Sequence, residues 1–188
     1  MEAKIAYFDK TGEENTDEVL RIARQRAKEL GIKTVLVAST WGNTAVKAVD
    51  VLKGLRVIIV THSAGFKGAN TQEFTDENKK IVESKGGIIL TCPHIFAAIS
   101  RSVRNKTNTT ELGDLISDVL RVAGGEGMKV TLEIAMMAAD AGLVRTDEEV
   151  IAIAGTVKGV DTAIVLNPVN SHQFFNMRVK EILCKPRF

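Results

Sequence analysis

A turn rich in hydroxyl groups follows a short apolar run early in the chain, and a helix is expected directly after it. Backbone N–H groups at a helix start have no intrahelical partner and lie at the positive end of the helix dipole, so they attract anions. Ser39, Thr40 and Thr44 can add hydroxyl donors. Gly42 lets the backbone approach a phosphate closely, and Asn43 can cap the helix. The turn therefore predicts a phosphate site, and an ordinary turn capped by Asn43 stays equally open.

Two further features supply candidate ligand contacts. Trp41, the only tryptophan, stands inside the same turn and can stack on a ring, although a lone tryptophan is more often part of a core. The polar loop 61–70 begins with Thr61, His62 and Ser63, and long loops in compact domains are often functional. His62 beside Ser63 suggests nucleophilic catalysis, but neighbouring loop residues need not face each other and the G-x-S-x-G pattern is absent. We therefore expect both side chains to donate to a ligand.

A glycine-rich segment later in the chain offers a second anion cradle. Gly127 and two glycines shortly before it precede Met128 and Lys129, which open another expected helix. The spacing matches neither the dinucleotide fingerprint nor a P-loop, so a plain flexible turn is an equal alternative. Glu133, one turn beyond Lys129, is expected to form an internal ion pair with it, and the role of general base is less favoured.

Composition excludes several classes of protein. The chain has 188 residues, which fits one α/β domain over residues 1–188 with a core of its own. A net charge of +2 gives no basic surplus for binding nucleic acid. The two cysteines and three histidines stand at no metal-ligand spacing, so we expect no metal, and the cysteines fit a reducing cytoplasm. Since no apolar run approaches about 18 residues, we expect no membrane helix and no export.

Apolar runs and segments of helical period alternate along the chain. Continuous apolar runs are typical of parallel strands covered on both faces, and we expect strands at 4–8, 34–38, 55–60, 87–91, 150–154 and 162–166, with a last edge strand at 178–184. Helices are expected at about 16–30, 45–52, 75–84, 95–102, 112–120 and 128–141. Asn15 with Glu18, and Asn108 with Glu111, resemble capping boxes. The basic stretch 101–110 is expected at the surface.

The connection between 150–154 and 162–166 is too short for a right-handed crossover, so these two strands should be antiparallel. The expected fold is therefore a three-layer α/β/α arrangement, with a mainly parallel sheet and an antiparallel strand at one side. Ligands bind such sheets beyond the carboxyl ends of the parallel strands. The turn 39–44 and the loop 61–70 lie at those ends, and they are the expected walls of a pocket.

Three segments of the chain resemble the carboxy-terminal domain of pyruvate kinase, namely VLVASTWGNTA, RVIIVTHSAGF and VIAIAGTVKGVDTAIVLNP. The chain as a whole resembles free-standing proteins of about this length built on that domain, with which FMN is associated and whose reaction is not established. The segments GEENT (12–16) and GMKV (127–130) are further marks of this resemblance.

The resemblance implies that the turn 39–44 holds a phosphate, because the corresponding turn of pyruvate kinase holds a phosphate of a sugar bisphosphate effector. This chain carries Trp41 and Asn43 where the enzyme's turn has basic or small polar residues. A monoester phosphate held by N–H groups and hydroxyls therefore fits better than a sugar bisphosphate. FMN carries such a phosphate.

We therefore expect a cytoplasmic FMN-binding protein, with flavin-dependent oxidoreduction of an unknown substrate as the reaction class if it is an enzyme. The alternative is a non-catalytic sensor or assembly module that binds a small phosphorylated metabolite. The expected helix 128–141 is apolar nearly all round, which favours this alternative because such a helix can serve a homo-oligomer contact. A hydrolase that uses His62 or Glu133 has the least support.

Overall fold

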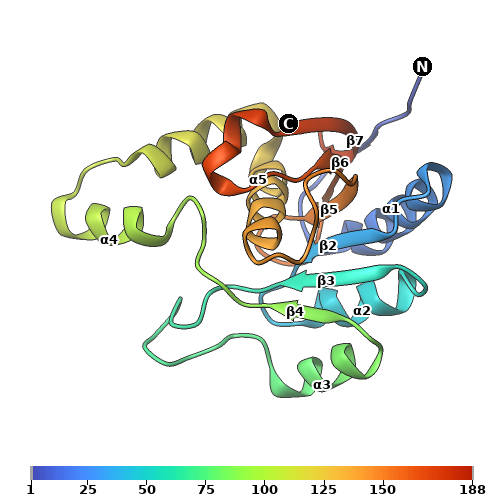
Figure 1. Cartoon of the computed structure of the whole chain (residues 1–188), viewed down its shortest axis with the longest axis horizontal. Helices are drawn as coiled ribbons and strands as arrows, with labels where there is room; N and C mark the ends of the chain where they lie inside the picture. Colours follow the sequence, from blue (N-terminus) through green and yellow to red (C-terminus); the bar gives the residue numbers. More distant parts are fainter. Residues whose placement is uncertain (1, 188) are drawn as a thin grey trace.

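The computed structural model describes residues 2–187, and these contain one seven-stranded sheet flanked by helices (Figure 1). In chain order the strands are β1 (Ala6–Phe8), β2 (Thr34–Ala38), β3 (Arg56–Val60), β4 (Ile88–Leu90), β5 (Val150–Ala154), β6 (Thr162–Asn167) and β7 (Arg178–Pro186). The helices are α1 (Thr16–Leu30), α2 (Asn43–Val51), α3 (Asp76–Ser84), α4 (Ala98–Thr107) and α5 (Leu112–Asp140), with 3₁₀ turns η1 (Glu13–Asn15) and η2 (Ser171–Asn176). The predicted α/β class is confirmed.

The strands lie in the order β1-β7-β6-β5-β2-β3-β4. β6 is antiparallel to both of its neighbours, which confirms the predicted antiparallel pairing with β5, and every other pairing in the described sheet is parallel. The prediction of 178–184 as the edge strand is wrong, because β1 pairs outside β7 and sets Ala6 beside Cys184. Cys184 is buried, so its backbone groups need partners, and β1 provides a second pairing strand there.

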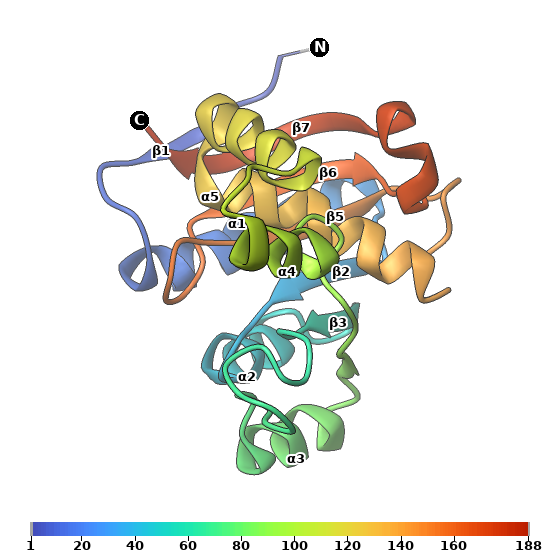
Figure 2. The same ribbon diagram turned by 90° about the vertical axis from the view of Figure 1, so that its left-hand side faces the viewer.

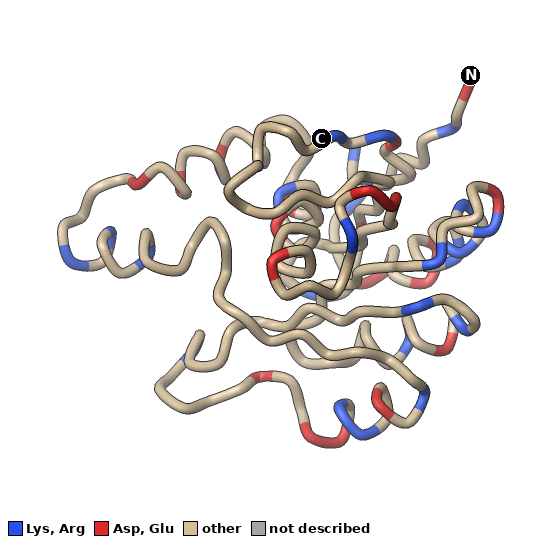
Figure 3. The backbone as a smooth tube through the Cα atoms, viewed as in Figure 1, with Lys and Arg blue, Asp and Glu red and all other residues tan. Residues whose placement is uncertain are grey.

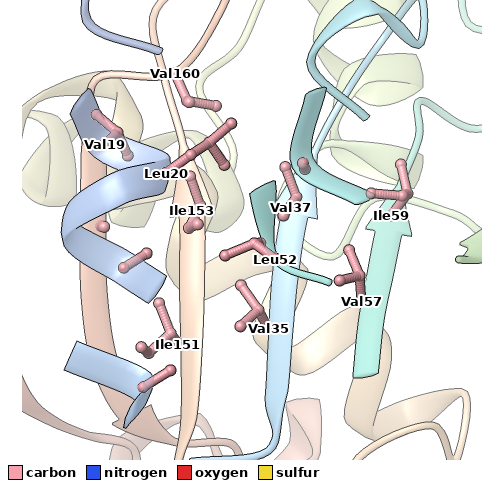
Figure 4. Close-up of a cluster of buried hydrophobic side chains, with 14 of the residues drawn as sticks. Val19, Leu20, Val35, Val37, Leu52, Val57, Ile59, Ile151, Ile153 and Val160 are labelled. Carbon is pink, nitrogen blue, oxygen red and sulfur yellow. The ribbon is translucent and has the colours of Figure 1, made fainter. Parts of the chain in front are cut away.

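Side chains of the central strands alternate between two apolar cores. Val35 and Val37 of β2 belong to the core beneath α1 and α2, and Figure 4 shows them beside Leu52, which directly follows α2. Leu36, between them in sequence, belongs to the opposite core, where it is clustered with Met137 of α5. Burial on both faces explains why the strands read as continuous apolar runs, and it confirms the three-layer arrangement.

Two predicted capping boxes are wrong. Asn15 precedes α1 in a helical conformation because η1 comes first, and its side-chain amide donates to the carbonyl of Lys10 instead. Asn108 ends α4 with a left-handed φ of 54°, since that helix begins and ends later than predicted and reaches Thr107. The box that forms lies three residues on, between Glu111 and Asp114 at the start of α5.

Helix α5 is 29 residues long and is interrupted at Gly125, whose φ of 88° and ψ of 176° are not helical. Its second half carries buried residues such as Ala135 and Met136 and packs on β5, β6 and β2, so the chain's own sheet covers it. Its apolar surface therefore does not by itself indicate a subunit contact. The first half extends with α4 away from the sheet (Figures 1 and 2). Within residues 2–187, none of the helices combines the length and the hydropathy needed to cross a bilayer.

Candidate functional site

A cavity of about 870 Å³ opens where β2 and β3 end. Its walls come from the turn after β2, the loop after β3, α4, the second half of α5 and the β5–β6 connection. The structure thus brings together eight of the predicted contacts, namely Ser39, Thr40, Trp41, Asn43, Thr44, Thr61, His62 and Lys129. Gly42 lies in the same turn.

Three of the predicted contacts lie outside the described cavity lining, namely Ser63, Gly127 and Met128. Met128 packs in the core beneath α5. A Cβ atom at Gly127 would come within 2.2 Å of the Thr162 hydroxyl oxygen, so this glycine permits the close approach of α5 to β6. Gly127 and Met128 therefore serve packing, and Lys129 is the part of that segment which reaches the cavity.

The turn before α2 has the geometry of an anion site. Gly42 adopts a left-handed conformation with a φ of 101°, and the helix begins at Asn43. The hydroxyl of Ser39 accepts the third helical N–H, that of Ala45, at 3.3 Å. The N–H groups of Asn43 and Thr44 are the first two of the helix and have no intrahelical acceptor.

The prediction of Asn43 as the helix cap is wrong, because Asn43 is the first helical residue and Ser39 takes the capping role. The side-chain oxygen of Asn43 instead accepts from the amide of Asn78 on α3, which also donates to the carbonyl of Trp41 at 3.0 Å. A Cβ at Gly42 would come within 2.5 Å of the Asn78 Cβ. Glycine is therefore required at 42 by both its backbone conformation and this contact.

His62 is fixed at the edge of the cavity by two partners. Its Nδ1 lies 2.7 Å from Oε2 of Glu73, and its Nε2 lies 3.4 Å from the hydroxyl oxygen of Thr40. The neighbouring Thr61 hydroxyl is used inside the protein, since it donates to the carbonyl of His62 and lies 2.6 Å from the hydroxyl of Thr91. Of the two predicted donors His62 and Ser63, only His62 lines the cavity. Thr61 also lines it, but its hydroxyl is already paired.

A buried ion pair forms the opposite wall. Lys129 Nζ lies 2.6 Å from Oε2 of Glu133, as predicted, and the backbone N–H of Phe96 donates to Oε1 of Glu133 at 3.0 Å. Burial opposes the ionised form of Glu133, but the interactions with His94, Lys129 and the Phe96 N–H outweigh it and lower the pKa of this carboxyl to about 2. Glu133 is therefore a fixed anion at neutral pH, which argues against the role of general base.

His94 presents an unsatisfied polar atom in the cavity lining. Its Nδ1 faces Glu133 at 3.7 Å, and its Nε2 is buried without a hydrogen-bond partner in the described part of the chain. The rings of His62 and Phe66 lie beside it, with centroids 5.4 and 5.3 Å from that of His94. A buried ring nitrogen without a partner is costly in a folded protein, so this position suits a polar ligand atom.

Basic side chains line much of the cavity, and most are already paired. Lys47 is paired with Asp17, and Arg104 with Asp114. Figure 3 shows basic residues along α4 beside the acidic first half of α5. Arg101 of α4 lies over the ring of Phe66, 4.5 Å from its centroid.

Sequence reasoning missed four of the groups at this site. One is His94, which stands in the sequence only as one of three histidines without metal-ligand spacing. Phe66 is the one aromatic residue of the loop 61–70, and that was its only signal. Arg101 belongs to a stretch that reads as plain surface, and Glu73 lies in a segment without a motif. Their approach to the cavity depends on loop conformation and on the position of α4.

The family model described as "Pyruvate kinase, alpha/beta domain" matches residues 17–166. The matched segment includes the turn after β2, the loop after β3 and all of α5.

Proposed function

The chain belongs to the pyruvate kinase alpha/beta domain family, and we propose that it binds a small phosphorylated ligand, FMN, in the cavity at the ends of β2 and β3. The observation that carries the proposal is the start of α2, where two helical N–H groups and nearby hydroxyls border the cavity. Such a helix start favours an anion both by hydrogen bonding and by its dipole.

The phosphate would be held by the N–H groups of Asn43 and Thr44 and by the hydroxyls of Thr40 and Thr44. All three residues line the cavity. The hydroxyl of Ser39 already accepts the Ala45 N–H, so its role is to hold the turn in shape. No cation belongs to the turn itself, which favours a monoester phosphate over a more highly charged ligand.

The rest of the cavity suits a planar ring system. Its volume of about 870 Å³ lies within the range of roughly 300–1,000 Å³ that small-molecule sites occupy. Trp41 and Phe66 supply apolar ring surface, while His62 and His94 supply polar atoms for the edge of a ring. A bound flavin would supply hydride-transfer chemistry, and the protein would orient it and exclude water.

Titration of the purified protein with FMN, followed by flavin fluorescence, tests this proposal. We expect saturable binding, and we expect Thr44→Val to weaken it about tenfold because one charge-assisted hydrogen bond is lost. The matched control is Thr110→Val, an exposed threonine outside this cavity, which should leave the affinity unchanged. Failure of FMN to bind, or equal affinity in both variants, would remove the proposal.

A second candidate function, assembly, rests on a different observation. Four apolar side chains stand exposed at spacings of three and four along the first half of α5, namely Leu112, Leu115, Val119 and Val122. The other side of this half is also apolar, since Ile116 and Leu120 pack on the body. Figures 1 and 2 show that this half projects from the sheet.

These four side chains form an apolar seam along α5, and their spacing of three and four residues is the pattern with which one helix packs against another. An identical helix related by a twofold axis offers the same seam. We propose that a second copy of this chain covers it. Sedimentation velocity with and without FMN separates the two functions. A change of mass on adding ligand would indicate a sensor, whereas a constant mass with FMN bound would indicate a flavoprotein whose assembly is independent of the ligand.

A further inference from the structure

Three polar side chains stand in line at the cavity edge. Thr40 Oγ1 lies 3.4 Å from His62 Nε2, and His62 Nδ1 lies 2.7 Å from Glu73 Oε2. We propose that these residues form a hydroxyl–imidazole–carboxylate relay in which Thr40 is a nucleophile toward activated carboxylic esters. This order of groups recurs on unrelated folds and is recognised by geometry rather than by position in the chain.

The sheet register places the first two groups side by side. β2 and β3 are parallel neighbours, and Ala38 at the end of one pairs with Val60 at the end of the other. Thr40 and His62 each follow two residues later, so both side chains emerge at the same edge of the sheet. The contact is therefore a consequence of strand pairing, which is a rigid part of the fold.

The third group is fixed by its own segment. Gln72, next to Glu73, donates from its side-chain amide to the carbonyl of His62 at 3.1 Å and accepts the N–H of Phe74 at 3.0 Å. Phe74 is buried in the core beneath α2. The side chain of Glu73 is only 12% exposed. Its carboxylate therefore fixes the imidazole of His62 through Nδ1, on the side of the ring opposite Thr40.

The surroundings of Thr40 resemble those of a nucleophile between a strand and a helix. Such sites carry small residues two positions before and two positions after the nucleophile, and backbone N–H groups stabilise the oxyanion, one of them from the residue directly after the nucleophile. Here Ala38 and Gly42 occupy the two small positions. The first N–H groups of α2, those of Asn43 and Thr44, border the same cavity. Gly42, rather than Thr40, carries the left-handed conformation of this turn.

The reaction balances without a cofactor. Oγ1 of Thr40 attacks the ester carbonyl carbon while its proton passes to Nε2 of His62, and the developing oxyanion faces the start of α2. The bond to the leaving alcohol then breaks, and the alcohol takes the proton from His62. Water, deprotonated by the same nitrogen, hydrolyses the acyl-threonine and restores the hydroxyl. Glu73 touches no reacting atom and is a positioning residue.

Reaction with p-nitrophenyl acetate tests the proposal, with nitrophenolate release and the intact mass of the protein as readouts. We expect a burst of nitrophenolate and one acetyl group mapped to Thr40. Thr40→Val should abolish both, whereas Thr40→Ser should keep them because it preserves the hydroxyl. His62→Ala should slow acylation at least about 100-fold. The matched control is His172→Ala, an exposed histidine outside the cavity, which should react like the wild type.

Glu73→Gln distinguishes positioning from general support of the fold. It should lower the acylation rate at saturating ester and leave the half-saturating ester concentration unchanged, while the matched variant Glu77→Gln on exposed α3 changes neither. Absence of an acetyl adduct at Thr40, or an adduct that forms equally fast in folded His62→Ala, would overturn the proposal. The reaction is read without FMN, so its failure leaves the flavin site standing, and failure of flavin binding leaves this result standing.

Discussion

Glu133 shows how a single buried carboxylate shapes the cavity. Its two oxygens hold the ammonium of Lys129 and the N–H of Phe96, so it joins α5 to the segment that leads into α4. Burying two charges costs free energy that their attraction offsets only when the geometry is good. The pair therefore contributes a fixed wall, and neither charge is free to act on a ligand without unpairing the other.

Replacement of Glu133 by Gln should lower the free energy of unfolding by about 3 kcal/mol at pH 7, because the ammonium of Lys129 would stay buried without its partner. The folded pKa of about 2 lies below the ordinary value of 4.5, so the stabilisation is complete above about pH 4.5 and is lost as the pH falls toward 2. Urea denaturation between pH 7 and pH 2.5 measures both effects.

Glu148→Gln is the matched control for this change, since that carboxylate is exposed and should cost less than about 0.5 kcal/mol. If Glu133→Gln lost stability by the same amount at pH 2.5 as at pH 7, the ionised state assigned to Glu133 would be incorrect.

At the scale of elements, the sequence predicted strands better than it predicted caps and loop contacts. β2, β3, β5 and β6 are continuous apolar runs because helices cover both faces, so their positions are visible in the residue types. The predicted capping box at Asn15 does not form, because the 3₁₀ turn η1 gives Asn15 a helical backbone conformation in place of the extended one that a capping residue adopts. The contact between His62 and Glu73 joins two points of an irregular loop, and residue types alone do not encode such a contact.

The exposed apolar seam of α5 is the proposed contact between two copies of the chain. Leu115→Asp should dissociate the proposed dimer, because a carboxylate in the seam would be buried without a partner. Sedimentation velocity at several protein concentrations measures the change. Phe175→Asp, an exposed apolar residue on η2, is the matched control and should leave the mass unchanged. A wild-type protein that stays monomeric at all concentrations would contradict the assignment.

At the scale of the whole molecule, Asp161 ties distant parts of the chain together. It is fully buried and accepts N–H groups from Gly12, before α1, and from Thr156, in the β5–β6 connection. The Thr162 hydroxyl also donates to it. The beginning of the chain is thus attached to the hairpin that borders the cavity.

Asp161→Ala should destabilise the fold by about 2–4 kcal/mol, because two buried N–H groups would lose their acceptor. Thermal or urea unfolding measures this loss. Asp147→Ala, which removes an exposed carboxylate paired with Arg145, should change stability by less than about 0.5 kcal/mol. Equal effects of the two substitutions would show that Asp161 does not join these segments energetically.

A comparison of FMN with riboflavin measures how much a phosphate at the start of α2 contributes to binding. The two ligands share the same ring and differ by that one group. Calorimetric titration should show FMN binding about 100-fold tighter than riboflavin, since the phosphate would engage two N–H groups and two hydroxyls. Affinities equal within about twofold, or no binding of either ligand, would rule out a phosphate site at the start of α2.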